Sequence, residues 1–301
     1  MDNLHSHNGI SNEIADLLGP WKVPGFLMII GGADRLDPES RLGRLFSELV
    51  HRTESSSEQE GIVLVSTATR HPEILTGEYI RLLTRLGVPP DRIHAPFIRN
   101  REEAHHPENV ALLAKAAGIF ITGGDQYTLT QMLDRTPAEE AILSAYHKGA
   151  VIAGTSAGAT AMGRPMIVAG GGSGELRMGM VQMSHGLGWV GDDIIVDTHF
   201  GARGRFPRLA SAVAGHPTAL GIGIDENTCI LVDSHGHCMV AGTGVIYFVD
   251  ASQVNLNTAH GAHIGTPISV GPLAVNVLSA GQQYDLLTRK VVFAEGSAHP
   301  V

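Results

Sequence analysis

The sequence has few cysteines and no long hydrophobic run, and each absence excludes a class of protein. Its 301 residues include two cysteines, Cys229 and Cys238, which is too few for a disulfide framework and is compatible with a reducing compartment. There is no run of about 18 apolar residues, so we expect no transmembrane helix and no membrane partner. The opening segment MDNLHSHNGISNEIADLLGPW lacks the basic and apolar regions of a signal peptide, so we expect a cytoplasmic protein.

Charged side chains are also scarce, and positive ones are in the minority. Asp, Glu, Lys and Arg make up 17% of the chain, and its net charge is −9 at pH 7. Such a chain lacks the basic surface that binds phosphate backbones, so we expect no nucleic-acid partner. Among the basic residues Arg greatly outnumbers Lys, and the planar guanidinium of Arg binds carboxylates in a bidentate manner.

Glycine, in contrast, is abundant, with 37 residues, and several glycines end apolar runs that are typical of buried parallel strands. Such strands are expected at residues 26–30, 61–69, 93–98, 119–124 and 150–159. Helical patterns lie between them, near residues 39–52, 73–87, 108–118 and 136–149, and a polar loop is expected over 53–61. The alternation predicts an α/β fold with a doubly wound, mostly parallel sheet.

The two ends of the chain differ from this central pattern. Residues 1–22 are interpreted as an N-terminal extension. The C-terminal 80 residues have shorter apolar runs and more Gly, Val and Thr, so we expect added strands and hairpins, one of which carries both cysteines. We therefore predict that residues 23–301 form a single α/β domain, with any catalytic site at the carboxyl ends of its strands.

A candidate nucleophile stands at the end of the strand expected over 150–159. The segment Gly154-Thr155-Ser156-Ala157-Gly158 matches the G-x-S-x-G elbow, in which small residues allow a sharp strand-to-helix turn that presents the hydroxyl. The alternative is a glycine-rich turn in which Ser156 caps a helix. A nucleophilic serine needs an oxyanion hole, for which the N–H groups of Ala157 and of Gly124, in a second glycine-rich strand end, are candidates.

A serine also needs a base that a third group holds in place. The chain has 16 histidines, and His199 is distinctive because it closes an apolar strand expected over 193–200. The third group could be Asp225 or Glu226, which both follow the apolar run 221–224, and spacing alone leaves the two open. An α/β-hydrolase order would instead require Asp225 with His235 or His237, and we find no matching oxyanion-loop motif early in the chain.

Four segments together resemble cyanophycinases, serine peptidases related to the aspartyl dipeptidase called peptidase E. They are GTSAGA (154–159), ITGGDQ (121–126), DTHF followed by R-G-R-x-x-R (197–208) and GIGIDENT (221–228). The resemblance extends from about residue 25 to the C-terminus. It implies a glutamine amidotransferase-like, flavodoxin-like three-layer sandwich with added C-terminal strands, and a homodimer.

The resemblance also implies roles for individual residues. The triad becomes Ser156, His199 and Glu226, so Glu226 is preferred over Asp225, and Gln126 lies near the substrate. No metal or organic cofactor is implied. One position departs from the family, which commonly has Gln where this chain has Thr198, and a hydroxyl cannot make the two-ended hydrogen bonds of an amide.

Cyanophycin is a polyaspartate chain with an arginine joined to each β-carboxyl, so a site for it needs both cations and anions. We expect three arginines, Arg203, Arg205 and Arg208, to bind its carboxylates and Asp197 to bind its guanidinium groups. Asp125 and Thr198 complete the expected substrate contacts. The alternative is that these arginines pair with the acidic side chains of the protein itself.

The resemblance therefore implies a serine-type exopeptidase that forms an acyl-enzyme and releases β-Asp-Arg dipeptides, although the sequence leaves trimming of chain ends and internal cleavage both open. A first alternative is an α-aspartyl or isoaspartyl dipeptidase of the peptidase E type. A second is an amidotransferase-like domain that binds a ligand without catalysis. Amidotransferases carry Cys at the elbow, and here that position is Ser156.

Overall fold

The computed structural model describes residues 25–33, 41–56, 58–171 and 174–293. The N-terminal extension expected over 1–22 lies outside this part of the chain. Among the residues that the structure describes, no helix is long and apolar enough to cross a membrane.

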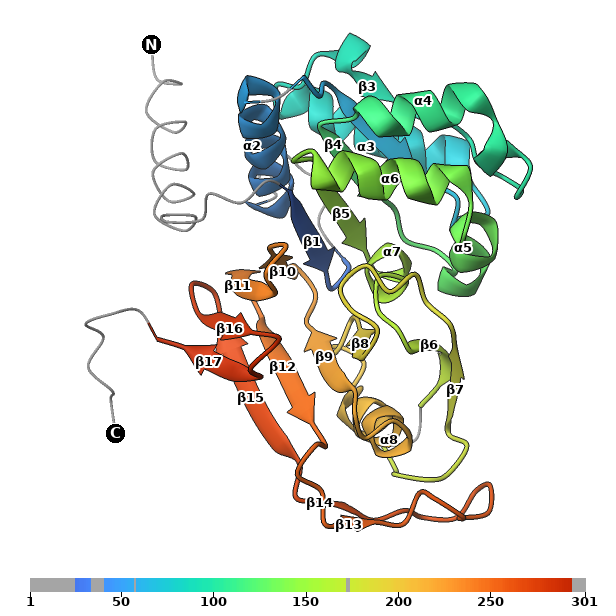
Figure 1. Ribbon diagram of the computed structural model, residues 1–301, viewed down its shortest axis with the longest axis vertical. Coiled ribbons are helices and arrows are strands. Elements are labelled where there is room, and N and C mark those ends of the chain that lie inside the picture. The colour runs from blue at the N-terminus through green and yellow to red at the C-terminus, as the bar shows by residue number, and fades with distance from the viewer. Residues whose placement is uncertain (1–24, 34–40, 57, 172–173, 294–301) are drawn as a thin grey trace.

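A nine-stranded sheet forms the larger part of the fold, in the order β17-β16-β11-β10-β1-β5-β4-β2-β3 (Figure 1). Five neighbouring strands are parallel: β1 (Phe26–Ile30), β5 (Val151–Thr155), β4 (Gly118–Ile121), β2 (Ile62–Val65) and β3 (Ile93–His94). Four antiparallel strands extend the sheet beyond β1: β10 (Thr228–Val232), β11 (His237–Gly242), β16 (Gln283–Asp285) and β17 (Lys290–Val292).

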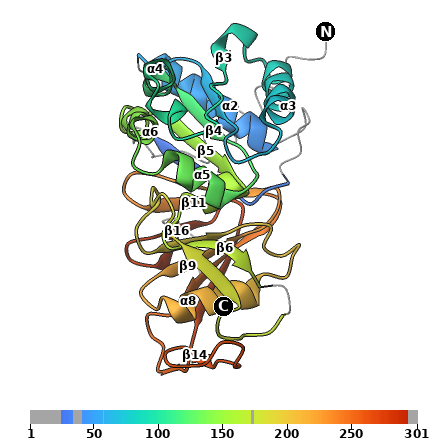
Figure 2. The same cartoon turned by 90° about the vertical axis from the view of Figure 1, so that its right-hand side faces the viewer.

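Helices cover both faces of the parallel part of this sheet (Figure 2). Side chains of β1 alternate between two apolar clusters, since Met28 packs on one face and Ile29 on the other. One face carries α2 (Arg41–Ser56) and α3 (Pro72–Arg85). The other carries α4 (Pro107–Lys115), α5 (Gln126–Leu133), α6 (Pro137–His147) and α7 (Ala157–Thr160). This arrangement confirms the predicted doubly wound α/β fold, with a mixed rather than purely parallel sheet.

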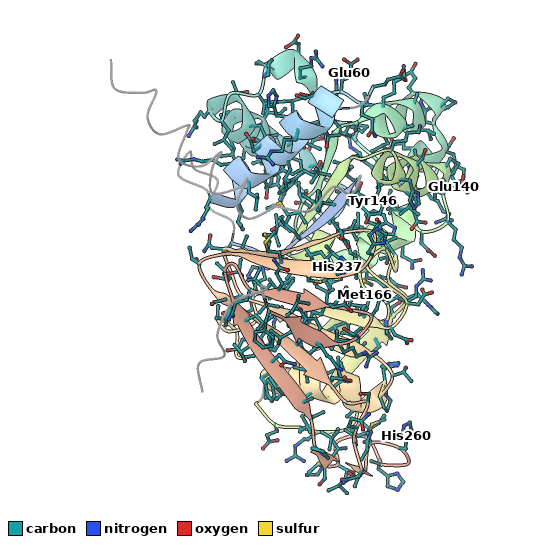
Figure 3. The ribbon with its side chains drawn as sticks, turned by 60° about the vertical axis from the view of Figure 1, so that its left-hand side comes forward. Glu60, Glu140, Tyr146, Met166, His237 and His260 are labelled. Atoms are coloured by element: carbon teal, nitrogen blue, oxygen red, sulfur yellow. The ribbon has the colours of Figure 1, made fainter. Side chains whose placement is uncertain are left out.

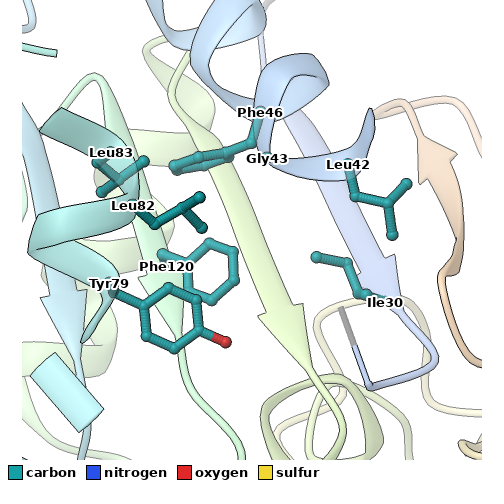
Figure 4. A pocket seen from close by; sticks show the side chains of 8 residues that line it. All are labelled: Ile30, Leu42, Gly43, Phe46, Tyr79, Leu82, Leu83 and Phe120. Atoms are coloured by element: carbon teal, nitrogen blue, oxygen red, sulfur yellow. The ribbon is translucent and has the colours of Figure 1, made fainter. Parts of the chain in front are cut away.

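The face under α2 and α3 contains a small apolar pocket (Figure 4). The ring centroids of Phe46 and Phe120 are 5.4 Å apart, and those of Tyr79 and Phe120 are 4.7 Å apart. Leu82 and Leu83 close it from α3. Apart from the Tyr79 hydroxyl its lining is apolar, so we assign it to the core.

A second sheet of four strands lies beside the first, in the order β15-β12-β9-β8. Its members are β8 (Ile194–Asp197), β9 (Leu220–Ile224), β12 (Val245–Asp250) and β15 (Ala274–Ser279), and α8 (Phe206–Gly215) packs on it. Two small hairpins complete the fold: β6 (Met166–Gly170) with β7 (Val181–Ser184), and β13 (Leu256–Asn257) with β14 (Val270–Gly271). The largest apolar cluster contains both Ile29 of the first sheet and Phe248 of the second. Figure 3 shows Glu60 and His260 at opposite ends of the molecule.

Several element boundaries differ from those expected from the sequence. The strand expected over 93–98 is limited to Ile93–His94, and α2 continues to Ser56 into the loop expected over 53–61. No bounds were predicted for α5, which begins where Asp125 Oδ1 accepts a hydrogen bond from the Thr128 N–H. At the start of α6, Thr136 caps the helix, because its Oγ1 accepts from the Glu139 N–H.

The predicted hairpin that carries the two cysteines is confirmed as β10–β11, and both cysteines are free. Cys229 packs on the same face as α2, whereas Cys238 packs on the opposite face, so the two thiols cannot meet. Burial raises the pKa of Cys229 to about 12, which keeps its thiol protonated and unreactive.

Candidate functional site

Ser156 stands at a strained junction between β5 and α7, with φ 52° and ψ −108°. Its N–H donates to Ile30 O at 3.1 Å, which ties the turn to the end of β1. Both glycines of the elbow are sterically required. A Cβ on Gly154 would lie 2.7 Å from the carbonyl of Gly158, and a Cβ on Gly158 would lie 2.5 Å from Ile121 O. The expected sharp turn after a core strand is therefore present.

His199 follows β8 and also has a positive φ, of 50°. Its Nε2 lies 2.8 Å from Ser156 Oγ, and its Nδ1 lies 2.7 Å from Glu226 Oε1. The imidazole packs directly on the backbone of Gly32, where a Cβ would be 2.4 Å from a ring carbon. The structure thus brings the three predicted side chains into one hydrogen-bonded chain.

Asp225, the alternative acid, has a different environment. Its Oδ1 accepts from the Gly201 N–H at 2.7 Å and its Oδ2 from the Val245 N–H at 3.2 Å. Its carboxylate therefore links the turn after His199 to β12. His237, from the α/β-hydrolase alternative, pairs with Asp233.

The end of β1 organises the site, a role that the sequence did not reveal. Three consecutive carbonyls accept from the three segments that carry the site: Ile30 O from Ser156 N, Gly31 O from His199 N, and Gly32 O from Asn227 N. The last two distances are 2.7 and 3.0 Å. The only signal was the glycine pair at the strand end, and the structure explains it, since a Cβ on Gly31 would lie 2.0 Å from Asp225 O.

The glycine-rich segment after β4 lies on the other side of the serine. A Cβ on Gly123 would be 4.0 Å from Ser156 Oγ. Gly124 has φ 145° and packs against Ala68, whose carbonyl accepts from the Asp125 N–H at 2.7 Å. The N–H of Ala157 is the first of α7 and so has no preceding helical carbonyl to bond.

Asp197 and Arg208, both expected to bind substrate, bind each other in this structure, which corresponds to the alternative in which the arginines pair with acidic side chains of the protein itself. Asp197 is fully buried, and Arg208 is 8% exposed. Arg208 Nε donates to Asp197 Oδ2 at 2.9 Å, Arg208 Nη2 donates to Asp197 Oδ1, and Arg205 Nη1 donates to the same oxygen at 3.2 Å. Both oxygens of the Asp197 carboxylate therefore accept from arginines of the protein itself.

Thr198, also expected to contact substrate, is buried as well. Its Oγ1 lies 3.4 Å from Thr160 Oγ1, and its carbonyl accepts from Arg205 Nη1 at 2.6 Å. Burial lowers the pKa of Arg205 to about 10, although the neighbouring Asp197 opposes that shift.

The other predicted contact residues lie nearer to the surface. Arg203 and Asp125 are exposed, and the half-buried Gln126 donates from Nε2 to Ile167 O at 2.8 Å and to Val168 O at 3.1 Å. Gln126 thereby holds β6 beside the glycine-rich segment. Among the described residues, no group of three His, Cys, Asp or Glu side chains could hold a metal ion.

The geometry of these side chains is that of a serine nucleophile with a histidine base and a carboxylate. A hydroxyl on a strained turn contacts one nitrogen of an imidazole whose other nitrogen contacts a carboxylate, which is how a serine is activated for covalent catalysis. Comparison with known proteins agrees with that class: residues 27–239 match the model of peptidase family S51, and the chain belongs to this family.

Individual relatives are cyanophycinases, which confirms the resemblance inferred from the motifs. The chain is 38% identical over 297 residues to the cyanophycinase of Nostoc sp. (strain PCC 7120 / SAG 25.82 / UTEX 2576), covering 97% of this chain and 96% of that protein. It is 32% identical over 268 residues to the cyanophycinase of Synechococcus elongatus, covering 89% and 81%. The fold resembles the crystal structure of a peptidase from an acI-B1 Actinobacterium, with a TM-score of 0.66 at 22% identity over 88% of this chain and 98% of that one.

Proposed function

We propose that this protein is a serine peptidase that hydrolyses cyanophycin to β-Asp-Arg dipeptides. The observation that carries the proposal is the chain Ser156–His199–Glu226, with hydrogen bonds of 2.8 and 2.7 Å. The 38% identity to a cyanophycinase along nearly the whole chain supports the choice of substrate.

In the proposed reaction, His199 Nε2 takes the hydroxyl proton as Ser156 Oγ attacks a backbone carbonyl carbon of the polyaspartate chain. Glu226 accepts the Nδ1 hydrogen of His199, which fixes the tautomer and stabilises the imidazolium. The proton then passes from Nε2 to the leaving amine, and the C–N bond breaks. Water, deprotonated by His199, hydrolyses the resulting ester and restores the hydroxyl.

The tetrahedral intermediate needs hydrogen-bond donors at its oxyanion, and we assign this role to the N–H groups of Gly124 and Ala157. Both belong to segments that flank Ser156, and neither depends on a side chain. Support for Gly124 comes from its φ of 145° and from the contact of this loop with Ala68, because only glycine fits there.

Substrate recognition is assigned to the exposed members of the predicted set. Arg203 supplies a cation for the carboxylates of the polymer, and Asp125 supplies an anion for its guanidinium groups. Arg205, whose side chain is 15% exposed, lies between this surface and the buried Asp197. Gln126 shapes the site through its bonds to β6.

The proposal is tested by incubating the full chain with insoluble cyanophycin and analysing the products by mass. We expect β-Asp-Arg from the wild type and, from Ser156→Ala, a rate lower by roughly 10⁴-fold or more at an unchanged melting temperature. Asp-X dipeptides are assayed in parallel. Their cleavage without release of β-Asp-Arg would contradict the proposal and favour the peptidase E alternative.

We further propose that the protein acts in the cytoplasm as a homodimer, on the basis of the family resemblance. In the described part of the chain, β15 pairs on one side only, and its Val275 and Val277 are 41% and 49% exposed. An apolar edge of this kind supports self-association. Sedimentation of the protein as a monomer at micromolar concentration would contradict the dimer.

A further inference from the structure

Asp197, Arg205 and Arg208 form a cluster of charged side chains next to His199. The proposed reaction does not use this cluster, but the cluster is hydrogen-bonded to Thr198, the residue before His199. Asp197 is the last residue of β8 and is fully buried, and its Oδ1 accepts from the Thr198 N–H at 2.9 Å. Arg205 Nη1 donates to the Thr198 carbonyl at 2.6 Å. Both polar groups of the Thr198 backbone are thus bonded to this cluster.

These hydrogen bonds to the Thr198 backbone matter because the backbone of the next residue, His199, is strained. His199 has a φ of 50°, in the left-handed region that residues with a Cβ rarely adopt. Such a conformation persists only where the surroundings fix it on both sides. On one side His199 N donates to Gly31 O, and on the other the Thr198 peptide is bonded to Asp197 and Arg205.

Arg208 makes this support rigid. Its guanidinium binds both oxygens of Asp197 and donates from Nη1 to Gly170 O at 3.1 Å, so it connects α8, the end of β8 and the end of β6. The same β6 is held by Gln126, beside the glycine-rich segment at Ser156. The Arg208 side chain also packs closely on Gly171, where a Cβ would lie 2.5 Å from it.

We propose that Asp197 and Arg208 are positioning residues, which hold the strained turn of His199 against Ser156 instead of forming a subsite for the polymer. The inference rests on the proposed function of Ser156 and His199. It gives a chemical purpose to two buried charges that would otherwise cost folding free energy without serving substrate binding.

A neutral, small fluorophosphonate distinguishes positioning from substrate binding. Ser156 Oγ attacks its phosphorus, fluoride leaves, and the hydroxyl proton passes to His199, while no carboxylate or guanidinium of a substrate is present. For Arg208→Met we expect the second-order labelling rate to fall by about 10–100-fold. We expect kcat/KM for cyanophycin to fall by the same factor, mainly through kcat. Arg208→Lys, which keeps the charge and can reach Asp197, recovers part of both rates.

The matched control is Arg289→Met. Arg289 Nη1 pairs with Asp250 Oδ1 at 2.8 Å in an ion pair that is somewhat more exposed than that of Arg208, at the end of β12 away from His199. We expect this variant to lose stability and keep its labelling rate below its melting temperature. Wild-type labelling of Arg208→Met, or an equal loss in Arg289→Met, would overturn the positioning role.

The same assay separates this inference from the substrate assignment. If the wild type is labelled at Ser156 but releases no β-Asp-Arg from cyanophycin, the substrate proposal fails and the positioning role stands. If the wild type is not labelled at Ser156, both fail.

Discussion

Gly32 shows how one residue without a side chain allows two others to meet. Its Cα carries no Cβ where the His199 ring packs, and its carbonyl accepts from the Asn227 N–H next to Glu226. The three proposed catalytic groups come from segments that are distant in the sequence. A small displacement at Gly32 would therefore separate the Ser156 hydroxyl from the His199 imidazole.

Substitution of Gly32 should therefore remove activity more than stability. In Gly32→Ala the new methyl would lie 2.4 Å from the ring, so we expect His199 to shift and kcat to fall by about 100-fold. Gly87→Ala is the control, because Gly87 has the same φ of 94° and open space around its Cα. Both variants share the cost of a positive φ, so equal activities in the two would contradict the steric account.

Substitutions of the neighbouring acids Asp225 and Glu226 should have different effects, the first on stability and the second on activity. Glu226→Gln keeps its size but loses the charge opposite His199, so we expect kcat to fall by about 10²–10⁴-fold with little change in melting temperature. Asp225→Asn can accept through one oxygen only, whereas Asp225 accepts two backbone N–H groups, so we expect a loss of about 1–2 kcal/mol of stability. Kinetics and thermal unfolding on both variants measure the two effects, and the reverse pattern would contradict the assignment.

At the scale of the elements, the contribution of the β16–β17 hairpin to stability should depend on pH. Asp285, at the end of β16, accepts from the N–H and the hydroxyl of Thr288, and these bonds lower the pKa of its carboxyl. A lowered pKa stabilises the fold above the unfolded value of about 4, and this contribution is lost as the pH falls through the folded value. We expect Asp285→Asn to lower the melting temperature by a few degrees at pH 7 and by progressively less below pH 4. A difference that grows on acidification would contradict this.

The elements also show what could be predicted from the sequence. Buried strands such as 26–30 and the elbow at Ser156 are local patterns, so their apolar runs and glycines were sufficient. The short β3 and the second sheet depend on long-range pairing, such as that of β8 with β9, which no local pattern encodes. The pairing of Asp197 with Arg208 stayed an open alternative for the same reason, because only the packing of α8 brings the two side chains together.

The molecule as a whole brings both sheets to one site. Ser156 follows a strand of the nine-stranded sheet, whereas His199 and Glu226 follow β8 and β9 of the four-stranded sheet. The end of β1 joins them through three consecutive carbonyls. Changes that shift one sheet against the other should therefore affect activity before they affect the stability of either.

The most direct test of the central claim is the mass of the products that the full-length protein releases from insoluble cyanophycin, compared with those of Ser156→Ala. We predict β-Asp-Arg from the wild type and essentially none from the variant, with the same melting temperature for both. Release of β-Asp-Arg by Ser156→Ala at the wild-type rate would contradict it.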